Sequence, residues 1–77
     1  MPDGQMTGDE WIRRYAAELG VEPLEEDQVQ ALLDMASVAA HTSERLAAPL
    51  SCYLVAKAGV SPQDALAIAQ RLAAPAS

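Results

Sequence analysis

The chain has 77 residues and a formal charge of −6, and 51% of its residues are hydrophobic. This length and composition indicate one small globular domain, near the lower size limit for a core that folds unaided, and they exclude a disordered chain. An acidic chain of this kind has no basic surface that could bind phosphate groups, so we expect no binding to nucleic acid or to an anionic membrane surface.

The acidic residues are concentrated in the first half of the chain. Residues 1–34 carry nine acids against two arginines, a net charge of −7, whereas residues 35–77 carry two acids against three bases, a net charge of +1. Sixteen residues are alanine and none is phenylalanine, so we expect a thin core and a net stability of only ~3–5 kcal/mol. A protein partner or a second copy can add stability, and we expect both a protein partner and a weak homodimer.

The first predicted helix follows a short polar tail and begins after Thr7. Thr7 and Glu10 have the spacing of a capping box, in which each side chain bonds the backbone of the other. Gly20 is suited to end the helix, because glycine tolerates the left-handed conformation of a C-cap. One apolar face is expected, formed by Trp11, Ile12, Tyr15, Ala16 and Leu19.

The second predicted helix begins at the acidic run 25–27, where negative charge favours a helix N-terminus. Residues 35–40 are apolar almost all round, which places this helix at the centre of a bundle. We expect residues 41–45 to be its polar end or the following turn. Its expected inner face comprises Val29, Leu32, Leu33, Ala36, Ala39 and Ala40.

Proline and glycine delimit two further helices. Pro49 predicts a helix over 49–58 that Gly59 closes, since proline suits a first turn and excludes helix in the residue before it. Ser61 and Pro62 predict a last helix that stops before Pro75. The residues expected to face inward are Leu50, Tyr53, Leu54 and Ala58 in the third helix, and Leu66, Ile68, Ala69, Leu72 and Ala73 in the fourth.

Four helices with short connections predict an all-α fold, a compact bundle of four short helices. The expected organisation is a flexible N-terminal tail at 1–6, a single helical domain at 7–74 and a C-terminal tail at 75–77. The polar start of the chain does not resemble a signal peptide, and no apolar run approaches the ~20 residues of a membrane helix. Cys52 has no disulfide partner and is expected to be a small buried hydrophobe. We therefore expect a cytoplasmic protein.

Reactive side chains are concentrated at His41, Glu44 and Arg45. His41 and Arg45 share a face if the helix continues, and together they can hold a phosphate or a carboxylate. Alternatively, both satisfy free carbonyls at a helix end. Ser43 could complete a triad, but no strained turn or oxyanion loop surrounds it, so we expect no enzyme. One histidine and one cysteine do not make a metal site, and we expect no cofactor.

Three features together resemble a known family. They are a Trp-containing first helix that ends in Leu19-Gly20, the sequence Leu32-Leu33-Asp34-Met35-Ala36 followed by His41, and Arg45 shortly before Ala48-Pro49-Leu50-Ser51. Over residues 8–60 the chain resembles a small uncharacterised helical domain of actinobacteria, which occurs alone or attached to a molybdenum-cofactor guanylyltransferase. The resemblance implies an accessory role near molybdopterin guanine dinucleotide synthesis, without nucleotidyl transfer by this chain.

These observations predict a non-catalytic helical accessory domain that acts through protein–protein interaction, with the guanylyltransferase as the expected partner. The alternative is a small-molecule or phosphate-binding domain that uses His41 and Arg45. An enzyme ranks third.

Overall fold

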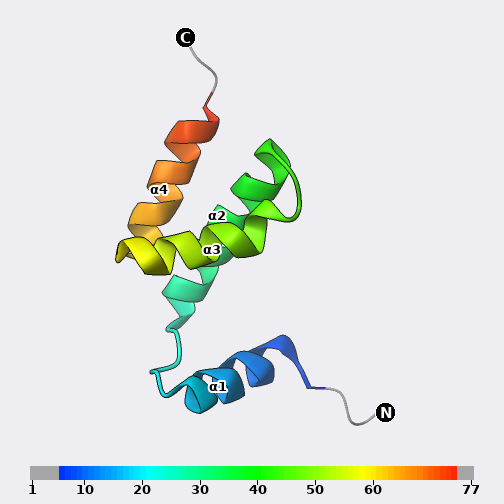
Figure 1. The fold of residues 1–77 in the computed structure, drawn as a ribbon, viewed down its shortest axis with the longest axis vertical. Helices are drawn as coiled ribbons and strands as arrows, with labels where there is room; N and C mark the ends of the chain where they lie inside the picture. Colours follow the sequence, from blue (N-terminus) through cyan, green and yellow to red (C-terminus); the bar gives the residue numbers. More distant parts are fainter. Residues whose placement is uncertain (1–5, 75–77) are drawn as a thin grey trace.

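A computed structural model describes residues 6–74 (Figure 1). These residues form four α-helices and no strand, which confirms the all-α fold of four short helices. Of the two predicted tails, residues 1–5 and 75–77 lie outside the described residues. The helices are α1 (Gly8–Leu19), α2 (Glu26–Thr42), α3 (Ala47–Ala58) and α4 (Pro62–Ala73).

The ends of α1 follow from local chemistry. The Thr7 backbone N–H donates to Glu10 Oε1 at 3.1 Å, and the Glu10 N–H donates to Thr7 Oγ1 at 3.1 Å, so the predicted capping box is confirmed. Gly20 adopts the left-handed conformation, with φ of 78°. In that conformation the N–H groups of Gly20 and Val21 reach the carbonyls of the last helical turn, which ends the helix.

The central helix α2 begins within the predicted acidic run. The N–H of Glu25 donates to Gln28 Oε1 at 2.9 Å, and Glu26 and Asp27 occupy the first turn. The helix ends at Thr42, where the hydroxyl of Ser43 donates to the Ala39 carbonyl at 2.8 Å. Residues 43–46 are therefore the turn to α3.

Helix α3 starts at Ala47, two residues earlier than the predicted Pro49. Pro49 is the third helical residue, and the first turn of a helix has no internal partner for its N–H groups, so the missing donor costs nothing there. Two short turns lead into the helix, with the N–H of Ala47 bonded to the Glu44 carbonyl and that of Ala48 to the Arg45 carbonyl. Ala48, the residue before Pro49, is therefore helical, although a following proline normally disfavours the helical conformation.

The corner between α3 and α4 matches the prediction. Gly59 has a φ of 75° and closes α3. Ser61 Oγ accepts a hydrogen bond from the Asp64 N–H at 3.1 Å, and Pro62 is the first residue of α4. The helix ends at Ala73, before Pro75, as expected.

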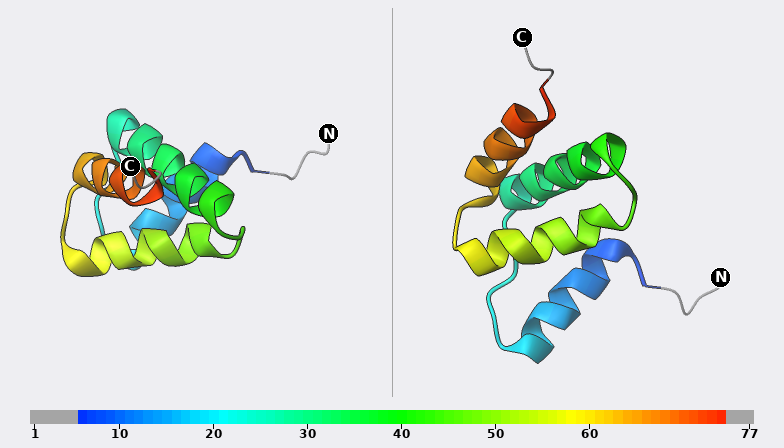
Figure 2. Two further views of the ribbon diagram at one scale, coloured as in Figure 1. Left: turned by 90° about the horizontal axis from the view of Figure 1, so that it is seen from above. Right: turned by 45° about the horizontal axis from the view of Figure 1, so that its top comes forward.

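The packing centres on α2, as the apolar run 35–40 predicted. The main helix–helix contacts join α2 to α4 and α2 to α3. Figure 1 shows α3 crossing α2, and in the right view of Figure 2 α2 lies between α4 and α3. Of the residues that the structure describes, Met35 on α2 is the most buried, with 3% of its surface exposed, and the others that are buried are Ala16, Ala31 and Ala65.

Several residues expected in the core are exposed instead. Leu33 is 60% exposed, Leu50 59% and Tyr53 69%, and Leu54, Ile68 and Leu72 are also exposed. The expectation that these side chains face inward is wrong for this chain. Helices α3 and α4 are covered mainly on their sides toward α2, and α2 is itself uncovered on the side that carries Leu33. Helix α1, at one end of a molecule measuring 50 × 28 × 19 Å, makes no comparable contact with the others (Figure 1).

Candidate functional site: an apolar groove and two uncovered helix faces

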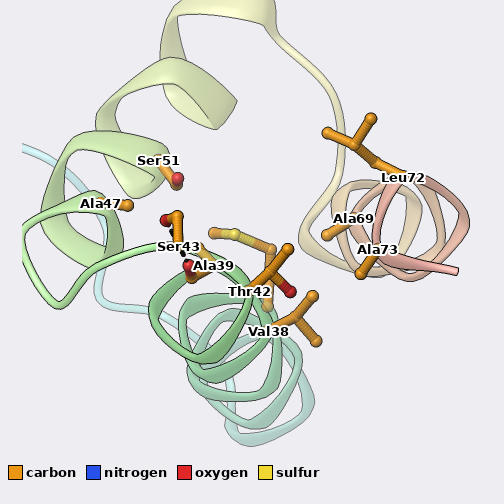
Figure 3. Close-up of a pocket in the computed structure, with 10 residues that line it drawn as sticks. Val38, Ala39, Thr42, Ser43, Ala47, Ser51, Ala69, Leu72 and Ala73 are labelled. Atoms are coloured by element: carbon orange, nitrogen blue, oxygen red, sulfur yellow. Dashed lines mark hydrogen bonds between the residues drawn. The ribbon is translucent and has the colours of Figure 1, made fainter. Parts of the chain in front are cut away.

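An apolar groove lies between α3 and α4, with α2 as its floor. Two adjoining hollows of about 230 and 260 Å³ form it, and both are lined by Met35, Ser51, Ala69 and Leu72. Figure 3 shows Ala69 and Ala73 of α4 on the side of Val38 and Thr42 of α2, and Ser51 of α3 across from them. Because most of these side chains are small, they leave the space between the two walls unfilled.

The lining of the groove is almost wholly aliphatic. Its α3 wall includes Leu54, Val55 and Ala58, and its α4 wall includes Ala65 and Ile68. Among residues 6–74, no charged side chain lines either hollow, and the polar side chains that do are the hydroxyls of Thr42, Ser43 and Ser51. This chemistry suits an apolar helix face or other apolar side chains, since it offers no group that could neutralise an anion or a cation.

The side of α3 that points away from the groove is also apolar. Leu46, just before the helix, is 62% exposed, and Leu50 and Tyr53 follow at intervals of four and three residues. That spacing places the three side chains in one stripe, which we call the outer face of α3. None of the three lines the groove.

Helix α1 carries a second uncovered apolar face. The rings of Trp11 and Tyr15 stack with centroids 5.3 Å apart and an interplanar angle of 16°. Trp11 is 52% exposed, Tyr15 49% and Leu19 60%, although each lies on the stripe that was expected to face a core. The two rings therefore pack on each other along α1 and stay about half exposed, and Trp11 also borders a hollow that Val29 and Leu33 of α2 line.

The structure separates the predicted site residues. His41 lies in the last turn of α2, and its Nδ1 is 3.2 Å from the Ser37 hydroxyl. Because α2 ends at Thr42, Arg45 lies in the following turn, so the two residues do not share one helix face. Glu44 and Arg45 accept backbone hydrogen bonds through their carbonyls. All three residues are exposed, and none lines the groove.

The hydroxyl of Ser43 is bonded to the backbone and not to His41. It donates to the Ala39 carbonyl, and the hydroxyl that pairs with His41 is that of Ser37. Within residues 6–74, no group of three His, Cys, Asp or Glu side chains is placed to hold a metal ion. None of the four helices is long and apolar enough to cross a bilayer.

Sequence reasoning did not find the groove or the outer face of α3. It assigned Leu50, Tyr53 and Leu72 to a closed core, because helical periodicity reports which residues share a side and not what covers it. The available signal was the alanine content, since small side chains fill little space between crossing helices.

The fold and these surfaces define a small all-α domain that has more apolar surface than its own helices cover. The chain belongs to the family described as domain of unknown function DUF6457, whose family model matches residues 3–77. Neither a curated protein nor a solved structure matches the chain.

Proposed function

We propose that this chain is a non-catalytic accessory domain that docks on a partner protein through the outer face of α3. The observation that carries the proposal is the exposure of Leu46, Leu50 and Tyr53, which are 62%, 59% and 69% exposed. Contiguous exposed apolar side chains on a soluble domain mark interaction sites, and tyrosine is enriched among the residues that dominate binding energy.

The partner we propose is a molybdenum-cofactor guanylyltransferase. The support is the resemblance noted above, whose Ala48-Pro49-Leu50-Ser51 segment forms the first turns of α3 and contributes Leu50 to the outer face. In this proposal the domain positions or stabilises the enzyme and carries out no chemistry itself. The pairing of Ser43 with a backbone carbonyl supports a non-catalytic role.

The test is a calorimetric titration of the purified domain with the guanylyltransferase from the same organism. We expect saturable binding with one domain per enzyme chain, and we expect Tyr53→Glu to weaken it about 30-fold or more, as for loss of a central contact of ≥ 2 kcal/mol. Gln70→Glu is the matched control, because it adds the same charge at an exposed position of α4 away from both surfaces. Absence of binding by the wild-type domain would reject this partner.

The second candidate is binding of phosphate or a small anion by His41 and Arg45. Its support is that both side chains are exposed and that the Arg45 guanidinium makes no ion pair or hydrogen bond with any residue of the described range. Titration with inorganic phosphate separates the two candidates. Phosphate binding that Arg45→Ala abolishes would favour the anion site.

A further inference from the structure

We propose that the surface that docks on the outer face of α3 is an amphipathic helix of the partner, whose apolar stripe is bordered by acidic side chains that contact Lys57. This inference rests on the proposed function, because it takes the outer face of α3 to be a docking site. It goes further by naming the chemistry of the surface that binds there. The position of Lys57, the charge of the surrounding chain and the shape of the face support it.

Lys57 lies on the same side of α3 as the exposed apolar side chains. It follows Tyr53 by four residues and Leu50 by seven, and these intervals place residues on one helix face. Lys57 is in the last turn of α3, is exposed and lines neither hollow of the groove. The outer face of α3 is therefore apolar along most of its length and carries a positive charge at its C-terminal end.

The stretch of chain around Lys57 contains no acidic residue. Residues 45–63 carry two bases and no acid, a net charge of +2, whereas the other residues carry three bases and eleven acids, a net charge of −8. Lys57 forms no ion pair with a carboxylate of residues 6–74. At the other end of the face Glu44 directly precedes Arg45 and offsets its charge. The charge of this face that is left without an opposite charge is that of Lys57.

The shape of the face points to a helix as its partner. From Leu46 to Lys57 the stripe is about 17 Å long and one helix wide. A second helix covers such a stripe with apolar residues that recur every three or four positions. An extended peptide adds to a free backbone edge, which a helix does not offer. Acidic residues beside the apolar stripe of the partner are attracted to Lys57, whereas basic residues there are repelled.

Two other roles for Lys57 predict different results. A base in the last turn of a helix is attracted to the dipole of that helix, and this attraction acts on stability and not on binding. An anionic membrane fits poorly, because this face of α3 carries a single lysine and the rest of the chain, at −8, is repelled by the same surface. Binding to a helix and binding to lipid vesicles therefore separate the three roles.

Titration with two designed helical peptides is the test. Both have the length of α3 and a leucine stripe, which is bordered by glutamate in one and by glutamine in the other. We expect Lys57→Glu to weaken binding of the glutamate peptide about ten-fold at low salt and to leave the glutamine peptide unchanged. Lys57→Gln, which removes the charge without reversing it, should weaken the glutamate peptide about three-fold. The loss should shrink at high salt.

Arg71→Glu is the matched control, because it changes the net charge equally at an exposed position of α4 that lines neither hollow. It should leave binding of both peptides within about two-fold of wild type. Equal losses from Lys57→Glu and Arg71→Glu overturn the proposal, as does a wild-type domain that does not bind the glutamate peptide. Binding to phosphatidylglycerol vesicles that Lys57→Glu abolishes, without binding of the glutamate peptide, assigns the face to a membrane and also overturns it.

The same variants in the guanylyltransferase titration separate this inference from the proposed function. If Tyr53→Glu weakens binding of the enzyme and Lys57→Glu does no more than Arg71→Glu, the docking face stands and the acidic border is rejected. If the enzyme does not bind but the glutamate peptide binds and depends on Lys57, the acidic border stands and this partner is rejected.

Discussion

Helices α1 and α4 are a matched pair with different surroundings. Both have 12 residues, both begin with a hydroxyl side chain that caps the third N–H of the helix, and both carry an apolar stripe. Each also buries one alanine, Ala16 in α1 and Ala65 in α4, yet α4 packs along α2, whereas α1 makes no comparable contact with another helix. The difference shows that local sequence is sufficient to place a helix and does not determine whether the helix is covered.

The largest expected effect is at Met35, the one large side chain that is well buried in the described part of the chain. Met35 lines the floor of the groove and is 3% exposed, whereas Leu33 on the same helix is 60% exposed. Met35→Ala should lower the free energy of unfolding by about 2–5 kcal/mol, enough to unfold much of so small a domain, and Leu33→Ala should cost under about 1 kcal/mol. Urea denaturation followed by circular dichroism measures both. Equal losses would contradict the burial pattern.

Removal of the two caps tests the comparison of α1 with α4 directly. Ser61→Ala should lower the global free energy of unfolding by about 1 kcal/mol, because α4 is packed on α2. Thr7→Ala removes a similar amount from α1, but we expect it to appear as faster amide exchange within α1 alone. Hydrogen exchange followed by NMR distinguishes them. A global loss from Thr7→Ala would show that α1 is coupled to the other helices.

The end of α2 gives a smaller effect. If His41 and Arg45 act only by interacting with the free carbonyls and the dipole at the C-terminus of α2, replacing either with alanine should lower the free energy of unfolding by about 0.3–1 kcal/mol. The losses should then add in the double variant. Thermal melts and phosphate titrations are measured on the wild type, His41→Ala, Arg45→Ala and the double variant. Unchanged stability together with a ten- to hundred-fold loss of phosphate binding would instead assign the pair to an anion site.

The smallest effect concerns the ion pair within α1. Arg13 lies 3.0 Å from Asp9 one turn earlier, and both side chains are 71% exposed. Arg13→Gln should cost α1 only about 0.3–0.5 kcal/mol, and the difference should vanish as salt is raised. Amide exchange within α1 at low and high salt measures it. A loss that persists at high salt would mean that Arg13 has a role beyond this pair.

The sequence by itself determined the four helices and most of their ends. Thr7 with Glu10, Ser61 with Pro62, and the glycines at 20 and 59 act within one or two turns, so their effect can be read without knowledge of the fold. The prediction for α3 missed its start by two residues, since the turns at Glu44 and Arg45 depend on how the chain leaves α2.

Only the tertiary structure decided which apolar faces are covered. Periodicity placed Leu50, Tyr53 and Leu72 on helix stripes, but their exposure depends on how α3 and α4 cross α2 and on where α1 lies. The same holds for His41 and Arg45, which are four residues apart in sequence but are separated by the end of α2. Burial is set by contacts between segments far apart in the chain, and the pattern within one helix does not say how its neighbours cross it.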